Sequence, residues 1–118
     1  MRDLAPHVVR QRLLIEGLYT IDVSRQQVAD YLTGLADRLG LRAYGEPVIH
    51  SPAGLGKVHN QGFDAFLPLI DSGISVYVWS SARFFAVVLF TCKRFDAAAA
   101  VEFTRRYFGA SDVESMSF

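Results

Sequence analysis

Side chains capable of covalent chemistry are concentrated between residues 71 and 92. Ser72 follows an acidic residue, Asp71, and precedes Gly73, which places a hydroxyl nucleophile in a flexible setting. Cys92 is the only cysteine of the chain, which excludes an internal disulfide and a cysteine-rich zinc site. Both features also have a structural interpretation, because Asp-Ser-Gly is an ordinary hairpin connection and a lone cysteine in an apolar strand is more often buried than reactive. The residue types alone leave a reactive hairpin and an ordinary one open.

The spacing around Ser72 resembles that of the small prokaryotic S-adenosylmethionine decarboxylases, in which a serine after an acidic residue becomes a covalent pyruvoyl group. In that family a histidine, a tryptophan and a cysteine follow the serine, and the corresponding positions here hold Tyr77, Trp79 and Cys92. The resemblance implies that Ser72 attacks the carbonyl of Asp71 and that Cys92 donates the proton that closes the catalytic cycle. The pyruvoyl group would serve as the electron sink for decarboxylation.

Tyr77 is the most consequential departure from the family pattern. The family histidine at this place assists self-processing as a base. A phenol with a reference pKa of about 10 stays protonated at neutral pH, whereas an imidazole at about 6.5 can take up a proton. We therefore expect slow or absent cleavage between Asp71 and Ser72. In the alternative interpretation, Tyr77 is an amphipathic strand residue with a hydrogen-bonded hydroxyl group.

Positions that the resemblance assigns to ligand binding or processing also differ from the family. Val58 replaces an aromatic residue that helps to hold the adenine ring. Trp79 is kept, but Ser80 and Ser81 follow it in place of proline and of a glutamate that would bind the ribose hydroxyls. Asp64 takes the place of a family serine that helps in processing. These changes leave either S-adenosylmethionine or another amino acid as the candidate ligand.

Three hypotheses about function follow from the resemblance. The leading one is a homodimeric, unprocessed protein without a cofactor that binds a small molecule or a partner. The competing one is a working pyruvoyl-dependent decarboxylase, with a cofactor derived from Ser72, that makes the aminopropyl donor for polyamine synthesis or acts on another amino acid. The third is a regulator that forms a mixed dimer with an active paralogue.

Composition limits the other function classes. The 118 residues are one domain's worth, so we predict a single domain over residues 1–118. The 12 basic and 12 acidic residues cancel, which argues against nucleic-acid and membrane-surface binding. The longest apolar stretch, 84–90, is too short to span a bilayer, and no hydrophobic leader is recognised, so we expect a soluble cytoplasmic protein. The histidines show no metal-ligand spacing, and no metal is predicted.

Apolar periodicity predicts the elements that must position these residues. Residues 8–20 have the pattern of a buried strand, and Ser24 starts a capping box at the beginning of a helix that ends at Gly40. A second helix begins at Asp96 and ends at Gly109. The other predicted segments are a strand over 41–50, a loop over 51–56, strands over 63–70, 74–79 and 84–92, and an edge strand over 113–118.

The resulting order, β-α-β-β-β-β-α-β, predicts an α+β fold. It is a two-layer α/β sandwich, with a mostly antiparallel sheet and two helices on one face. The turn 71–73 and the turn 80–83 reverse the chain between strands. The other face of the sheet needs its own cover. We therefore expect a homodimer in which aromatic residues of that face, Phe85 or Phe90 among them, pack against a second subunit.

Overall fold

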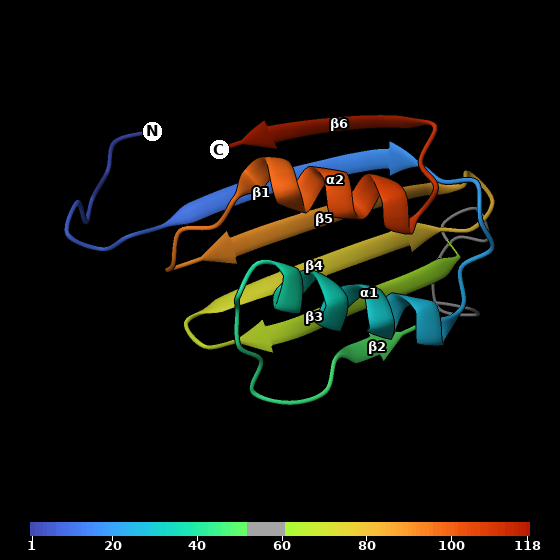
Figure 1. The fold of residues 1–118 in the computed structure, drawn as a ribbon, viewed down its shortest axis with the longest axis horizontal. Helices are drawn as coiled ribbons and strands as arrows, with labels where there is room; N and C mark the ends of the chain where they lie inside the picture. Colours follow the sequence, from blue (N-terminus) through green and yellow to red (C-terminus); the bar gives the residue numbers. More distant parts are fainter. Residues whose placement is uncertain (52–60) are drawn as a thin grey trace.

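A computed structural model describes residues 1–51 and 61–118, in which the chain forms six strands and two helices (Figure 1). The elements are β1 (Gln11–Leu18), α1 (Arg25–Arg38), β2 (Val48–His50), β3 (Gly62–Leu69), β4 (Ser72–Trp79), β5 (Phe84–Thr91), α2 (Ala97–Tyr107) and β6 (Asp112–Ser117). Their order agrees with the order that the sequence predicts. No helix in the described ranges is long and apolar enough to cross a membrane.

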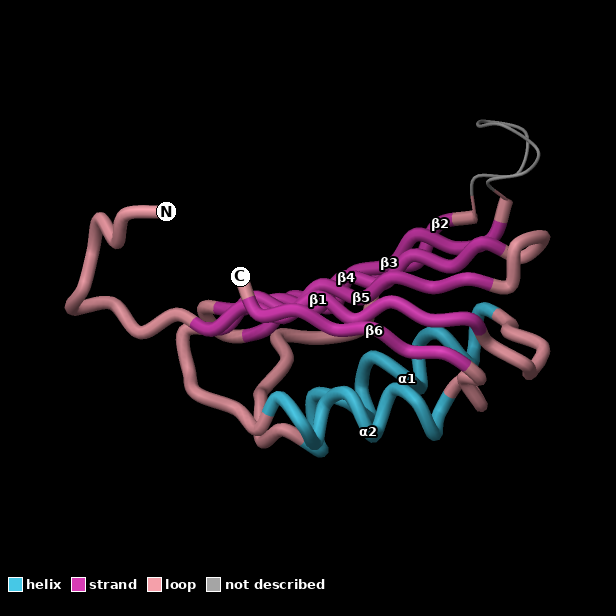
Figure 2. The backbone as a smooth tube through the Cα atoms, turned by 90° about the horizontal axis from the view of Figure 1, so that it is seen from above, coloured by secondary structure: helices cyan, strands magenta, loops and turns pink. Residues whose placement is uncertain are grey.

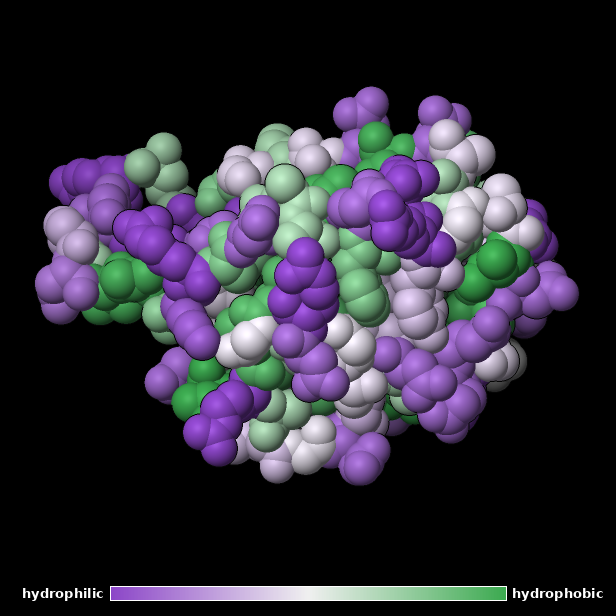
Figure 3. Space-filling view, in the orientation of Figure 1, coloured by the Kyte–Doolittle hydropathy of each residue, from purple (hydrophilic) through white to green (hydrophobic). Residues whose placement is uncertain are grey.

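The strands form one antiparallel sheet in the order β2-β3-β4-β5-β1-β6. β3, β4 and β5 are the predicted meander, and β1 lies between β5 and β6, with Ile15 opposite Val87. Both helices of the described residues pack on one face of the sheet, which gives two layers (Figure 2). From the helix side, polar groups surround smaller apolar areas (Figure 3).

Side-chain caps set the helix boundaries. The Ser24 hydroxyl accepts the Gln27 N–H at 3.2 Å, and the Gln27 side chain accepts the Ser24 N–H at 2.7 Å, which is the predicted capping box. Asp96 accepts the Ala99 N–H at 3.0 Å at the start of α2. Gly109 ends α2 with a φ of 55°, a conformation that glycine adopts without steric cost.

An aromatic cluster joins the helices to the sheet. Phe108, just after α2, stacks on Phe85 of β5 at 4.5 Å between ring centroids and packs on Tyr31 of α1 at 4.8 Å. The expectation that Phe85 lies on the open face is therefore wrong, since its side chain is fully buried on the helix side. The reason is strand alternation, which puts Phe85 in one cross-strand row with Gly17 and Val78.

Two predicted strands are shorter in the structure. The strand predicted over 41–50 is reduced to β2, because Gly45 and Pro47 interrupt it, although Ala43 still forms an isolated bridge to Leu69. The strand predicted over 8–20 begins only at Gln11. Residues 1–10 instead form an arm that leaves the sheet and turns toward the side away from the helices (Figure 2).

The second face of the sheet, called the open face below, carries no helix among the described residues (Figure 2). Its central strands expose large side chains, with 43% of Phe66, 39% of Tyr77 and 42% of Phe90 accessible. Phe90 thus lies where it was predicted. Other apolar residues continue this surface toward the sheet edges, namely Val48, Leu14, Val88 and Met116. A surface of this kind on a small domain indicates an interaction site.

Candidate functional site

The hairpin between β3 and β4 places Ser72 in a strand, whereas the sequence predicted it in the turn. The turn consists of Ile70 and Asp71, and Ser72 is already the first residue of β4, opposite Leu69. Asp71 has a φ of 55°, in the left-handed region, which costs a non-glycine residue about 1–3 kcal/mol. The peptide bond between Asp71 and Ser72 therefore follows a strained residue.

Ser72 and Cys92 are neighbours at the ends of adjacent strands. The Cys92 backbone N–H donates a hydrogen bond to the Ser72 Oγ at 3.1 Å. Cys92 is half-buried and follows the last residue of β5, where the Thr91 hydroxyl donates to the Lys93 carbonyl at 2.7 Å. A backbone donor fixed at the hydroxyl oxygen would stabilise negative charge developing on it. Cys92 also lines a cavity at the strand ends, together with Ser72.

Two shallow cavities meet at Asp71 and Ser72. The first, of about 360 Å³, lies on the open face, and its other lining residues are Phe66, Gly73, Ser75, Val88 and Phe90. The Phe66 ring covers Gly73 so closely that a Cβ atom at Gly73 would lie 2.6 Å from its Cε1. The second cavity, of about 330 Å³, lies at the strand ends, and its other lining residues are Gly40, Leu41, Arg42, Ile70, Cys92 and Lys93. A ligand in either cavity would therefore lie next to Ser72.

Arg42 and Lys93 add positive charge that the sequence interpretation missed. Lys93 donates from its Nζ to the Gly40 carbonyl at 2.9 Å, and its position next to Cys92 could have identified it. Arg42 comes from the segment after α1, and the Ile70 N–H donates to its carbonyl at 2.9 Å. No local pattern relates Arg42 to Ser72, since this long-range contact alone brings it to the hairpin.

Tyr77 does not lie beside Ser72 in the same chain. Because successive strand residues alternate between the two faces, an odd separation of five residues puts the two side chains on opposite faces. The strand rise separates them by roughly 16 Å. Tyr77 lies instead on the open face directly opposite Asp64, and Asp64 lies opposite His50 of β2. The processing positions Tyr77 and Asp64 are therefore together, but away from the nucleophile.

The remaining predicted positions lie elsewhere. Trp79 ends β4 at the far end of the sheet, where its ring packs on Phe84 at 5.2 Å between centroids and its carbonyl accepts the Tyr19 hydroxyl at 3.1 Å. Ser81 lies in the following turn, and Val58 lies outside the described residues. Among the described residues of one chain, then, the structure brings Asp71, Ser72 and Cys92 together, whereas Asp64, Trp79 and Ser81 lie elsewhere.

The fold and this hairpin can be compared with known proteins. The family model described as S-adenosylmethionine decarboxylase matches residues 18–118. The chain belongs to the S-adenosylmethionine decarboxylase family. A solved structure of the adenosylmethionine decarboxylase from Aquifex aeolicus VF5 superposes with a TM-score of 0.70 at 15% identity, over 94% of this chain and 89% of that chain. No curated protein matches. The predicted family and its two-layer fold are thus confirmed, and the low identity agrees with a divergent S-adenosylmethionine decarboxylase homologue.

Proposed function

We propose that this S-adenosylmethionine decarboxylase homologue stays uncleaved and acts as a homodimeric binding protein for a small molecule or a protein partner. One observation carries the proposal: the position of the processing base holds Tyr77, whose phenol stays protonated at neutral pH, where the family has a histidine. The hydrogen-bond partner that the described structure gives the Ser72 Oγ is the Cys92 N–H, a donor. A donor can stabilise charge on the oxygen but cannot remove its proton.

Self-cleavage has requirements that this arrangement meets only in part. The Ser72 oxygen must form a bond to the Asp71 carbonyl carbon while the bond from that carbon to the Ser72 nitrogen breaks and the nitrogen gains a proton. The resulting ester must then lose a proton from the Ser72 Cα and release the Asp71 carboxylate. Both steps need a base. The strain at Asp71 supports the first step, whereas the replacement of imidazole by the Tyr77 phenol removes the group that the family uses.

The charges around the hairpin support a carboxylate-bearing ligand. Arg42 and Lys93 line the cavity at the strand ends, and Asp71 and Ser72 supply acceptors for an ammonium group. An amino acid carries both charges, and so does S-adenosylmethionine. We therefore propose an amino acid or S-adenosylmethionine as the ligand, bound between the two cations and the hairpin. We also propose that the protein is cytoplasmic.

The open face supports the homodimer. Its exposed Phe66, Tyr77 and Phe90 would leave water if a second sheet covered them. A second copy would also roof the open-face cavity beside Ser72 and bring its own Tyr77 and Asp64 toward that cavity. A mixed dimer with an active paralogue would use the same face and would be recognised by co-purification of two different chains.

Intact-mass measurement of the freshly purified full chain tests the proposal. We expect one mass for the 118-residue polypeptide, identical in behaviour to a Ser72→Ala control that cannot cleave. Fragments of residues 1–71 and 72–118, the second lacking a free amino group, would overturn it. Tyr77→His should restore cleavage over hours to days if the missing base is the cause. A Tyr77→His chain that stays intact would show that the base argument is incomplete.

A working pyruvoyl-dependent decarboxylase is the second candidate. It is favoured by the strained Asp71 and by the row of His50, Asp64 and Tyr77 across β2, β3 and β4, which offers an imidazole beside a carboxylate. A pyruvoyl group formed from Ser72 would supply a ketone as the electron sink, with Cys92 beside it as a proton donor. If the wild-type chain is found cleaved, His50→Gln should abolish cleavage, whereas Ser75→Ala on the same face should not.

A further inference from the structure

Charge is unevenly distributed along the open face. Glu16 of β1 and Glu114 of β6 are directly opposite each other, an arrangement in which like charges repel. Asp64 lies in the same cross-strand row, through Tyr77 and Ala86. Neither glutamate forms an ion pair within the described ranges. Two carboxylates that face each other without a cation among the described residues leave this end of the open face negative, which favours contact with a basic surface.

The other end of the same face is basic. Arg12 lies two positions before Leu14 on β1, and its guanidinium stacks on the Phe118 ring at 5.7 Å. Its Nε is buried and has no hydrogen-bond partner in the part of the chain that the structure describes, a costly state for a donor. Arg2 and Arg94 line the adjoining cavity of about 330 Å³ beneath the arm.

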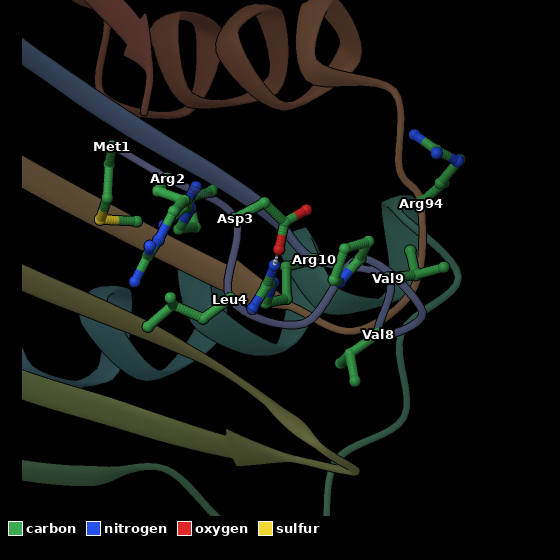
Figure 4. A pocket seen from close by; sticks show the side chains of 10 residues that line it. Met1, Arg2, Asp3, Leu4, Val8, Val9, Arg10 and Arg94 are labelled. Atoms are coloured by element: carbon green, nitrogen blue, oxygen red, sulfur yellow. Dashed lines mark hydrogen bonds and ion pairs between the residues drawn. The ribbon is translucent and has the colours of Figure 1, made fainter.

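The arm holds its own shape, and its acidic residue Asp3 bonds to Arg10 and attracts Arg12 only at longer range. Asp3 forms an ion pair with Arg10 and accepts the Ala5 N–H at 3.0 Å, which closes residues 3–10 into a loop (Figure 4). Because Asp3 is committed to Arg10, the arginines Arg2, Arg12 and Arg94 have no ion-pair partner within residues 1–51 and 61–118.

A second copy of the chain can be stacked on the open face by a two-fold axis in two principal ways. An axis parallel to the strands places basic end on basic end and carboxylate row on carboxylate row, which is repulsive. An axis perpendicular to the strands reverses one copy, so that each basic end covers the other copy's carboxylates. If this axis passes over Leu14, the central residue between Arg12 and Glu16, the row of Arg12 lies over the partner's row of Glu16 and Glu114.

We propose that this homodimer is held in an antiparallel register by reciprocal ion pairs between Arg12 of each copy and the Glu16–Glu114 pair of the other. Packed sheets lie about 10 Å apart, a gap that an arginine and a glutamate side chain span together. The same register puts Tyr77 of one copy over Gly73 of the other, beside its Ser72. The inference rests on the proposed homodimer and adds the residues that set how the second copy is oriented on the open face.

Charge reversal tests the register. The full chain and the variants Arg12→Glu and Glu16→Arg are compared by sedimentation velocity across a concentration series. Each variant alone should self-associate roughly 10- to 100-fold more weakly than wild type, because both symmetric contacts become repulsive. An equimolar mixture of the two should form a heterodimer of near wild-type affinity, since every Arg12–Glu16 contact then joins opposite charges. Asp37→Arg and Arg38→Glu, on the exposed end of α1, serve as matched controls and should dimerise like wild type.

The outcomes separate the register from the dimer itself. Recovery of association only on mixing, with circular dichroism showing both variants folded, supports the proposal. Variants that dimerise as wild type does, or that fail to recover on mixing while remaining folded, overturn the register and leave the homodimer standing. A wild-type chain that is monomeric at tens of micromolar in low salt overturns both. Salt titration adds a readout: wild-type association should weaken with ionic strength more steeply than that of Arg12→Glu.

Discussion

The buried contact between α1 and α2 allows a quantitative prediction. The Tyr31 hydroxyl lies 2.7 Å from the Thr104 Oγ1, and the Thr104 hydroxyl donates to the Ala100 carbonyl at 2.8 Å, so Tyr31 is the donor in the first contact. Neither Tyr31 nor Thr104 is accessible to water. Thr104→Val keeps the side-chain shape but leaves the Tyr31 hydroxyl buried without an acceptor. An unsatisfied buried hydroxyl costs about 1–3 kcal/mol.

Thermal and urea unfolding at one fixed protein concentration measure this cost. For a domain of this size a loss of 1–3 kcal/mol lowers Tm by roughly 3 to 12 °C. The double variant Tyr31→Phe with Thr104→Val should recover most of the loss, because removing both partners leaves no orphaned group. Thr33→Val is the matched control: its hydroxyl bonds to the Ala29 carbonyl on the exposed side of α1, and its loss should change stability by less than about 0.5 kcal/mol.

The result that refutes this reasoning is a Thr104→Val chain as stable as Thr33→Val. The Tyr31 hydroxyl would then have another acceptor or access to water, and the tie between the helices would not depend on it. A double variant less stable than Thr104→Val alone would also contradict the account, since it would mean that the two hydroxyl groups contribute independently.

Two further predictions concern the same core. Burial raises the pKa of Tyr31 above its ordinary value, so on raising the pH the hydroxyl group loses its proton in the unfolded chain before it does so in the folded one. The free energy of unfolding is therefore unaffected by this group below about pH 10 and falls above it, by up to about 1.4 kcal/mol per pH unit. Urea unfolding between pH 9 and 11 should show a shallower decline for Tyr31→Phe, and an unchanged slope would contradict the assignment. Gly17→Ala should cost about 1–3 kcal/mol, because its Cβ would lie 2.6 Å from the Phe85 Cζ and 2.8 Å from the Asp112 carbonyl oxygen. Phe85→Leu should make the added cost of Gly17→Ala smaller, because it removes the first of these two contacts. Gly45→Ala, with open space around it, is the control, and equal stability of the two alanine variants would count against the clash.

Local patterns predicted the elements well wherever the signal is short-range. The capping box at Ser24, the Asp96 cap and the Gly109 terminus appear in the structure as expected, because each depends on residues within one helical turn. The strand over 41–50 was predicted too long, since apolar content outweighed the interruption at Gly45 and Pro47. Secondary structure of this kind is decided within a few residues, and its boundaries are where context matters most.

The site residues were predicted from their spacing along the chain. Which of their side chains share a face of the sheet depends on whether the number of residues between them along the strand is odd or even. Ser72 and Cys92 were expected as a pair and lie together at the ends of adjacent strands. Tyr77 takes the place of the family's processing base, but within one chain the period of two in a strand puts its side chain on the other face from that of Ser72. Phe85 was misplaced for the same reason. Once β4 is known to begin at Ser72, the odd separation of five residues between Ser72 and Tyr77 is enough to place the two side chains on opposite faces.

By itself the sequence determined the family, the element order and the hairpin that carries Ser72, because these follow from residue types at fixed short spacings. Only the tertiary structure decided which charges share a surface. Arg42 reaches the hairpin through a contact with Ile70, and Glu16 meets Glu114 through the pairing of β1 with β6, nearly a hundred residues apart along the chain. The physical reason is that sheet register is set by the whole packed core, in which Ile15, Val87 and their neighbours must be buried together, and no local pattern encodes which distant strand will lie alongside.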